Sequence, residues 1–197
     1  NPFYKLRNKK RENKYSKKIW PLTPAEFAQF EKAAFKAPEQ IKLLVLFLLY
    51  TGCRISDVSG LQVRDINLTE NIPTIYLRDN EIRRLDKNGL RSNIPLVGPL
   101  LEELRKYQPP ENYRDAFLPQ FGRLKSYRDR AQQEASKVLR AAKVVREGVR
   151  PHSARHTWQD RLDAARVPIS ERDYLLAHKT EQSSAIAMAY GTSYPPK

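Results

Sequence analysis

The stretch PHSARHTW, residues 151–158, places two of the chain's three histidines four positions apart, with an arginine between them. His152 and His156 have the i, i+4 spacing of a helical zinc pair, and the remaining histidine would be a third ligand. However, Ser153 stands where a zinc protease of this pattern carries its catalytic glutamate, and Arg155 would set a positive charge beside the metal. A metal site is therefore disfavoured, and His156 keeps the ordinary interpretation of a packed histidine bonded to backbone.

The same stretch is expected to open a helix over about 154–166, with Ser153 as its N-cap. Apolar residues recur on one face of this helix, at Ala154, Trp158, Leu162 and Ala165. Arg155 is thus expected to lie off that face and in the first turn. A cation at this position destabilises the helix by up to about 1 kcal/mol, because it lies at the positive end of the helix dipole. A bound anion such as phosphate would make the same position favourable.

Arg54 stands in the same kind of position elsewhere in the chain. In TGCRISDVSGL, residues 51–61, it follows a helix expected to end at Gly52 and precedes a short helix over 55–61. Asp57, three residues later, is placed to orient the guanidinium through paired hydrogen bonds. Two arginines at two helix starts indicate one shared anion, although each arginine could instead pair with a nearby acid.

The net charge of the chain indicates which kind of molecule it binds. Lysine and arginine number 36 against 22 acids, which gives a net charge of +14 and predicts a polyanionic partner, with nucleic acid the leading candidate. A membrane partner is disfavoured, because no basic amphipathic helix with an aromatic face is found and the apolar run at 43–50 is too short to span a bilayer. A single cysteine, Cys53, excludes an intramolecular disulfide, fits a reducing cytoplasmic compartment, and is expected to be a small packed residue.

Two parts are expected along the chain. Residues 1–22 are predicted to be a basic linker, because the first 18 residues hold eight cations against one acid. Residues 23–197 are predicted to be one folded domain. Its first helix is expected to begin at Pro24, with Thr23 and Glu26 forming a capping box.

The rest of the domain is expected to be mainly α with a small antiparallel β-sheet (α+β). Further helices are expected at about 39–50, 55–61, 99–107, 126–146, 154–166, 170–178 and 180–191. The helix from residue 170 would be capped by Ser170. Between Ile72 and Leu96, short apolar runs alternate with turn residues at 79–80 and 87–89, which predicts two or three antiparallel strands.

Set in order, these motifs resemble those of the tyrosine recombinase family of phage integrases. TGCRIS resembles the family's first catalytic box, and PHSARHT resembles the second, with its His-x-x-Arg-His pattern. LLAHK, residues 175–179, resembles the Leu-Leu-Gly-His box, with Ala177 in place of the glycine. AMAYG, residues 187–191, puts Tyr190 where the family has its nucleophile. The resemblance covers about Thr23 to Tyr194 and implies the family's catalytic-domain fold, without its amino-terminal core-binding domain.

The resemblance implies a site-specific DNA recombinase or integrase that cuts and rejoins strands through a 3′-phosphotyrosyl intermediate, without a metal or another cofactor. The implied catalytic residues are Arg54, Lys87, His152, Arg155, His178 and Tyr190. By resemblance, the two arginines clamp the charge on the phosphate. The first histidine assists proton transfer or donates to the phosphate, the second donates to the phosphate, and the lysine protonates the leaving 5′-oxygen. No role is assigned to His156.

Two of these positions are less firmly placed than the others. Lys87 is the only lysine in the expected hairpin, but hairpins of the family vary in length. His178 and Tyr190 are twelve positions apart, longer than is common in the family, so Tyr194 is a second candidate nucleophile. Tyr190 is favoured because the segment before it, followed by Gly191, has the pattern of a short capped helix that ends at the tyrosine.

The implied partner is double-stranded DNA. The resemblance implies a tetramer on paired DNA sites for the full-length protein and is compatible with a monomer for the isolated domain. The implied location is cytoplasmic and nucleoid-associated. One alternative is a type IB topoisomerase, which resembles this family in fold and catalytic residues. The compact length without long insertions favours the recombinase. Another alternative is a DNA-binding relative without catalysis, which the presence of every candidate catalytic residue disfavours.

Overall fold

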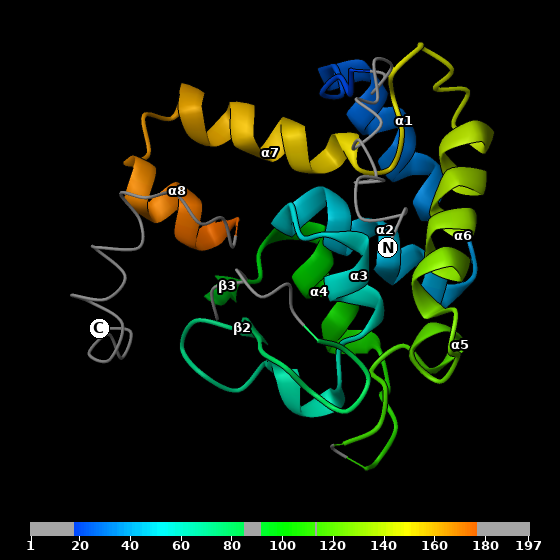
Figure 1. The fold of residues 1–197 in the computed structure, drawn as a ribbon, viewed down its shortest axis with the longest axis vertical. Helices are drawn as coiled ribbons and strands as arrows, with labels where there is room; N and C mark the ends of the chain where they lie inside the picture. Colours follow the sequence, from blue (N-terminus) through cyan, green and yellow to red (C-terminus); the bar gives the residue numbers. More distant parts are fainter. Residues whose placement is uncertain (1–17, 85–91, 113, 177–197) are drawn as a thin grey trace, which may run out of the picture.

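The computed structural model describes residues 18–84, 92–112 and 114–176. Figure 1 labels most of the elements within these ranges. The helices are α1 (Pro24–Ala34), α2 (Glu39–Thr51), α3 (Ile55–Ser59), α4 (Gly98–Lys106), α5 (Pro119–Gly122), α6 (Tyr127–Ala141), α7 (Ser153–Ala164) and α8 (Ile169–Leu175), with a 3-10 turn η1 at Val63–Asp65. The strands are β1 (Ile66–Asn67), β2 (Thr74–Leu77) and β3 (Ser92–Pro95).

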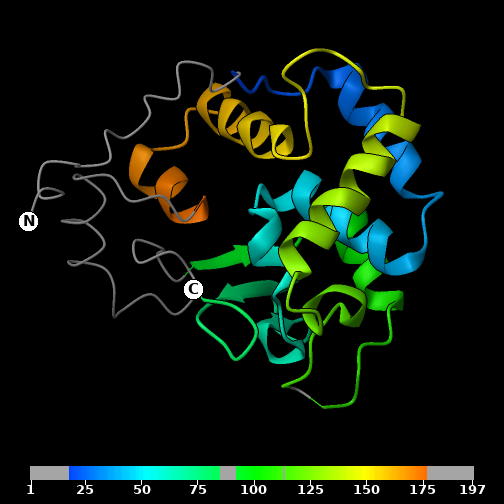
Figure 2. The ribbon, with the colours of Figure 1, turned by 45° about the vertical axis from the view of Figure 1, so that its right-hand side comes forward.

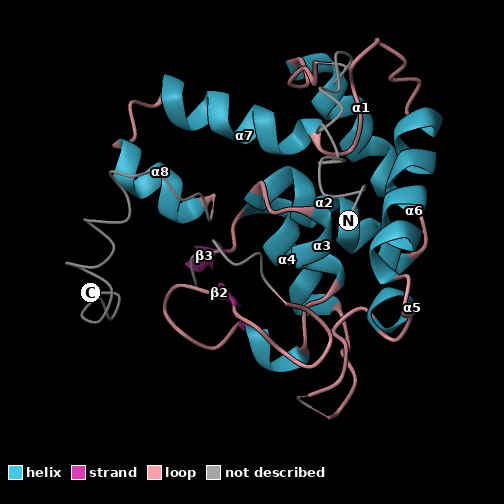
Figure 3. Cartoon of the chain, in the orientation of Figure 1, coloured by secondary structure: helices cyan, strands magenta, loops and turns pink. Residues whose placement is uncertain are grey.

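The sheet is small and lies at one side of the helices (Figure 2). Its order is β1-β2-β3, and both pairs are antiparallel, with Ile75 of β2 opposite Ile66 of β1 and Ile94 of β3. The predicted fold class, mainly α with a small antiparallel sheet, is confirmed (Figure 3). The prediction of two or three antiparallel strands between residues 72 and 96 is confirmed by β2 and β3, whereas β1, which precedes that range, was not predicted. With two residues, β1 is too short to produce an alternating pattern.

Helix α2 is the centre of the core. Its residues 43–49 are all buried, and helices α1, α3, α4, α6 and α7 pack against it. A helix that is apolar on every side has no face for solvent, so it is stable only when other helices surround it. The elements around α2 are therefore placed by its burial, and they include the starts of α3 and α7.

The beginning of α1 and the end of α2 confirm the local predictions. The Thr23 side chain accepts a hydrogen bond from the Glu26 N–H at 3.2 Å, and the Glu26 carboxylate accepts one from the Thr23 N–H at 2.8 Å. Gly52 ends α2 in the left-handed conformation, with φ of 65°. A Cβ at Gly52 would lie 2.8 Å from the Cβ of Trp158 in α7, so a glycine also permits this close packing.

The ends of α6 and α7 correct the sequence analysis. α6 ends at Ala141 instead of residue 146, because Lys143 turns into the left-handed region (φ 60°) and the Val144 N–H bonds to the Leu139 carbonyl. This hydrogen-bond pattern is a Schellman motif, and burial of Val144 against the helix favours it over another turn. α7 ends two residues early, at Ala164, by the same motif. No glycine marks either end, so the sequence pattern did not predict them.

The turn at 79–80 is confirmed, because the Asn80 side-chain oxygen accepts hydrogen bonds from the N–H groups of Ile82 and Arg83. The turn predicted at 87–89 and the helix predicted at 180–191 lie outside the described residues. Ser170 is the second residue of α8 instead of its cap. Within the described ranges, no helix is long and apolar enough to cross a bilayer.

The residues just before α1 lie against the folded domain. The Trp20 N–H donates to the Gly148 carbonyl at 3.1 Å, and the Leu22 N–H donates to the Thr157 hydroxyl at 2.8 Å. Arg146 donates to both carboxylate oxygens of Glu26, each at 2.8 Å. The last residues of the predicted linker are thus tied to α7 and to the α6–α7 connection.

The ion pair between Arg146 and Glu26 predicts a pH-dependent contribution to stability. Hydrogen bonding by Arg146 lowers the pKa of Glu26 from its usual 4.5 to about 2. The pair therefore stabilises the fold above about pH 4.5, and this stabilisation is lost as the pH falls toward 2. Arg146→Gln should lower the free energy of unfolding at pH 7, measured by urea denaturation, because the Glu26 carboxylate loses its charged partner.

The difference in the free energy of unfolding between Arg146→Gln and the unmodified chain should decrease steadily as the pH falls. Arg140→Gln, which changes an exposed arginine in the last turn of α6, is the matched control and should have little effect. A difference that stays constant down to about pH 2 would show that Arg146 acts through something other than the Glu26 carboxylate.

Candidate active site

Arg155 is a buried cation that joins the ends of two helices. Its side chain, in the first turn of α7, is 5% exposed. Its guanidinium donates to the carbonyl of Gly52 at 2.9 Å and to the carbonyl of Leu176. These two residues are the C-caps of α2 and α8, where carbonyl groups without helical partners carry the negative end of the helix dipole.

The expectation that Arg155 lies off the core face is therefore wrong. Helical periodicity treats a charged side chain as a surface residue, but here two helix ends provide buried acceptors for it. Burial, with a smaller effect of the nearby Arg54 charge, lowers the pKa of Arg155 to about 10, so the side chain stays charged at neutral pH. A guanidinium has five N–H donors, and the two carbonyls leave others able to bind an anion.

Arg54 reaches the same place from α3. It is the N-cap residue of α3, and its backbone N–H donates to Asp57 at 3.3 Å, while its guanidinium lies 4.0 Å from the same carboxylate oxygen. The predicted pairing with Asp57 is confirmed as an ion pair, but the paired hydrogen bonds are not formed. With a third of its side chain exposed (34%), Arg54 keeps its guanidinium open to solvent.

His152 lies beside both arginines. It occupies the N-cap position of α7, with helical φ and ψ of −63° and −17° and no side-chain cap. Ser153 is the first helical residue instead of the cap, and its hydroxyl accepts a hydrogen bond from the Arg150 N–H. Burial first, and then the charges of His156, Arg155, Arg150 and Arg54, lower the pKa of His152 to about 4. His152 is therefore a neutral imidazole at pH 7.

The two histidines of the opening stretch contact each other edge to face. The ring centroids of His152 and His156 are 5.3 Å apart, with 78° between the ring planes. In residues 18–84, 92–112 and 114–176, no group of three His, Cys, Asp or Glu side chains is placed to hold a metal ion. His178, the third histidine considered for such a site, lies outside these ranges.

Arg54, His152 and Arg155 thus lie together, at the start of α3 and the start of α7. The other predicted site residues, Lys87, His178 and Tyr190, and the alternative Tyr194, lie outside the described residues. Leu176 is the last described residue before His178 in the LLAHK motif. Its carbonyl accepts a hydrogen bond from the Arg155 guanidinium. α8 also contacts β3, where the Tyr174 hydroxyl accepts a hydrogen bond from the Asn93 N–H at 3.0 Å.

Two features of this region are not indicated by the sequence pattern. Backbone carbonyls of Gly52 and Leu176 hold Arg155, and only the glycine at the end of α2 gave any signal of such an acceptor. A second buried arginine, Arg83, donates to the carbonyl of Asp57 from below α3. Nothing in the local pattern of Arg83 distinguishes it from the exposed Arg84 beside it.

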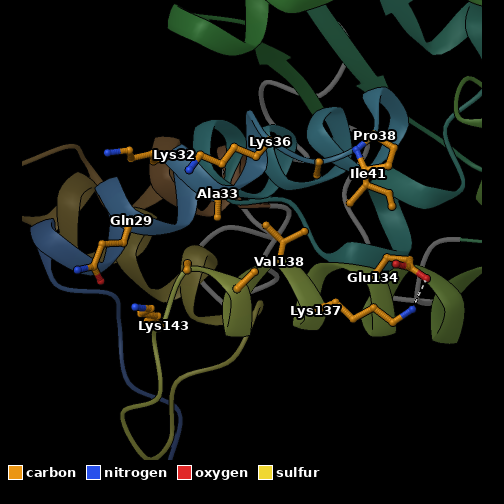
Figure 4. A pocket seen from close by; sticks show the side chains of 13 residues that line it. Gln29, Lys32, Ala33, Lys36, Pro38, Ile41, Glu134, Lys137, Val138 and Lys143 are labelled. Carbon is orange, nitrogen blue, oxygen red and sulfur yellow. Dashed lines mark hydrogen bonds and ion pairs between the residues drawn. The ribbon is translucent and has the colours of Figure 1, made fainter.

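A separate hollow of about 570 Å³ lies between α1, the start of α2 and α6 (Figure 4). Four lysines line it, over an apolar floor that includes Ile41 and Val138. The lysines are Lys32, Lys36, Lys137 and Lys143. None of the three residues brought together at α3 and α7 lines this hollow, so it is distinct from the candidate site.

The order and type of these residues agree with a family-level match. A model of the phage integrase family matches residues 21–194. The chain belongs to the phage integrase family. The resemblance of its motifs to the tyrosine recombinases is thereby confirmed.

One curated relative of this integrase-family chain is the tyrosine recombinase XerA of Pyrococcus furiosus. The two are 25% identical over 166 residues, which make up 84% of this chain and 55% of XerA. The chain therefore spans about half the length of this relative.

Solved structures share the fold of this phage integrase domain. A crystal structure of XerA recombinase matches with a TM-score of 0.62 at 17% identity, over 93% of this chain and 66% of that one. XerH recombinase bound to its difH substrate before cleavage matches with a TM-score of 0.62 at 19% identity, over 89% and 52%. A lambda integrase dimer bound to a COC′ core site matches with a TM-score of 0.62 at 20% identity, over 95% and 53%.

The site predicts an unusual histidine titration. His152 should titrate near pH 4, because burial and neighbouring positive charge disfavour the imidazolium. Its folded pKa lies below its unfolded value of about 6.5, so stability should fall as the pH drops from about 6.5 toward 4. NMR of the imidazole signals across pH measures the midpoint directly.

His156→Gln is the informative variant, because it removes the second-largest cause of the shift. The midpoint of His152 should then rise toward its usual value without reaching it, since burial remains. A midpoint near 6.5 in the unmodified chain would mean that His152 is solvated and not part of a cationic site.

Proposed function

We propose that this chain is the catalytic domain of a site-specific DNA recombinase that cuts and rejoins strands through a covalent 3′-phosphotyrosyl intermediate. The observation that carries the proposal is the meeting of Arg54 and Arg155, with neutral His152 beside them, at the starts of α3 and α7. Like charges brought together in a partly buried site repel each other. An anion between them removes that repulsion, and a DNA phosphate is the anion that the family implies.

The proposed reaction exchanges one phosphate ester for another. The Tyr190 oxygen attacks the scissile phosphorus, the tyrosine O–H proton is transferred to His152 or to solvent, and the phosphorus–5′-oxygen bond breaks. Lys87 donates a proton to the leaving 5′-oxygen. The reverse attack by a 5′-hydroxyl of another strand restores the diester and the tyrosine, so no high-energy cofactor is consumed.

The arginines have separate tasks in this proposal. Arg54, with its side chain partly exposed and in single contact with Asp57, is free to bind a non-bridging phosphate oxygen. Arg155 is held in advance by two carbonyls and presents its other donors without reorganisation, which is how fixed donors stabilise a developing charge. His178 is proposed as a further phosphate donor.

The proposed partner is double-stranded DNA in the cytoplasm, bound at the nucleoid. A tetramer on paired sites is proposed for the full-length protein. In support, lambda integrase has been crystallised as a dimer on a core site and as a tetramer on a Holliday junction. The surplus of 14 positive charges on the chain supports DNA as the partner.

The nucleophile can be tested by trapping the intermediate. The 197-residue chain, mixed with a library of nicked duplexes that carry a randomised segment, should form a protein–DNA adduct stable in SDS. The nick lets the short strand with the free 5′-hydroxyl diffuse away, which prevents religation. Tyr190→Phe should abolish the adduct, Tyr194→Phe should retain it, and EDTA should have no effect.

An adduct that persists in Tyr190→Phe but is lost in Tyr194→Phe would move the nucleophile to Tyr194. Absence of any adduct, together with DNA binding, would favour a relative without catalysis. Relaxation of supercoiled DNA without strand exchange would favour the topoisomerase alternative.

The role of Arg54 can be separated from DNA binding. Arg54→Gln should slow single-turnover cleavage by about 10²-fold or more on the duplexes recovered from the library. DNA affinity should fall much less, because one cation among many is lost. Arg140→Gln, which changes an exposed cation in the last turn of α6, is the control and should leave cleavage of bound DNA nearly unchanged. Equal losses of cleavage and affinity in Arg54→Gln would show that Arg54 only binds DNA.

A further inference from the structure

Arg83 is the largest fully buried side chain among the described residues, with 1% of its surface exposed. It lies in the connection after β2, outside the set of residues assigned to catalysis. This connection packs tightly beneath α3, since a Cβ added to Gly60 would lie 2.7 Å from the Cβ of Arg83. A charged side chain is thus enclosed directly under the helix that begins after Arg54.

The guanidinium of Arg83 joins α3 to the sheet. One nitrogen donates to the carbonyl of Asp57, and another donates to the carbonyl of Arg78 at 2.7 Å. The carboxylate of Asp65 is 3.8 Å away. Asn80 holds the backbone around Arg83, because its side-chain oxygen accepts the Arg83 N–H and its backbone N–H donates to the Arg83 carbonyl.

This arrangement is not the one that stability alone would favour. Within the described ranges, the Nε of Arg83 is the one buried side-chain nitrogen or oxygen without a hydrogen-bond partner. A buried ion pair replaced by well-packed apolar side chains is often as stable or more stable. The guanidinium of Arg83 therefore calls for a role beyond filling space.

Besides Asp65, the carboxylate of Asp57 is a group on which the Arg83 charge acts. Asp57 is buried (5% exposed), and the groups that face it are Arg54 of α3, Arg83 of the β2 connection, Arg155 of α7 and the Cys53 thiol. Burial raises the pKa of Asp57, and Arg83 is the strongest of the neighbours that oppose this rise. Asp57 in turn caps the backbone N–H of Arg54 and pairs with its guanidinium.

We propose that Arg83 is a positioning residue for strand cleavage, which fixes α3 from beneath through its hydrogen bond to the Asp57 carbonyl and so keeps Asp57 and Arg54 in place for the scissile phosphate. The proposal rests on the recombinase function proposed above. Because Arg83 is fully buried beneath α3, it acts through Asp57 on Arg54. Removing its charge lets Asp57 take up a proton at higher pH, and a neutral Asp57 no longer orients Arg54.

The test is the pH profile of single-turnover cleavage. In Arg83→Gln, which keeps a side-chain donor but not the charge, the acid side of the profile should move up by about one pH unit, as expected when a nearby opposite charge is lost. On that side the rate should fall about tenfold, and alkaline pH should restore it to within about twofold of the unmodified chain. Arg83→Lys keeps the charge and should restore the original profile.

Arg78→Gln is the matched control. Arg78 also pairs with Asp65, at 2.7 Å, but it is not among the charges that act on Asp57. Its removal should leave the pH profile in place. Arg83→Gln added to Asp57→Asn should cause no further shift, because the group on which Arg83 acts is already neutral. A rate loss in Arg83→Gln that is equal at every pH would overturn the proposal.

If Arg83→Gln does not fold, NMR of the unmodified chain tests the same link. The chemical shifts of the Arg54 and Arg83 Nε–H groups should both change with pH, and their midpoints should equal the midpoint at which the Asp57 carboxyl carbon titrates. An Arg83 signal that does not follow this midpoint would overturn the proposal. Failure of the recombinase function is distinguishable, because the unmodified chain would then form no adduct with DNA while the NMR link remained measurable.

Discussion

The position of the candidate site depends on the buried guanidinium of Arg155. It starts from α7 and donates to carbonyls at the ends of α2 and α8, so one side chain connects three helices. Both carbonyls belong to helix C-caps, where the negative end of the helix dipole stabilises a positive charge, and the Asp57 carboxylate also favours the charged form of Arg155. Because α2 is enclosed by the core and cannot move, the other two helices are placed relative to it. The cation that is proposed to bind phosphate is therefore also the one that sets the geometry of the site.

The charges of the site are arranged for a ligand more than for the free protein. Arg54 lowers the pKa of Arg155, and both arginines lower that of His152, which means that their positive charges repel one another in the absence of an anion. Asp57 offsets part of this repulsion from α3. Local energetic conflict of this kind concentrates at functional sites, where a bound ligand resolves it. A phosphate bound by the two guanidinium groups would offset this repulsion, and it would favour the protonated form of His152.

The sequence predicted local features whose causes are local. The capping box at Thr23, the glycine stop at Gly52 and the start of α3 after Arg54 depend only on neighbouring residues, and all are confirmed. The sequence did not predict features decided by distant parts of the chain. Burial of Arg155 depends on acceptors at Gly52 and Leu176, which are distant in sequence. The end of α6 depends on burial of Val144 against the core, which accompanies its hydrogen bond to Leu139. Motif order could therefore bring Arg54, His152 and Arg155 together, but it could not say how each is held.

The three arginines around α3 differ in exposure, and this difference indicates how the work is divided between them. Arg83 and Arg155 are buried, and both use their forked donors on backbone carbonyls, which fixes helices and leaves their charges in place permanently. Arg54 is partly exposed, and its guanidinium has one distant carboxylate contact. A rigid pair of buried cations on either side of Asp57 lets the more exposed arginine remain adaptable without losing its direction. Lysine at either buried position would keep the charge but not the planar fork, because a single ammonium on a flexible stem does not reach two carbonyls at once.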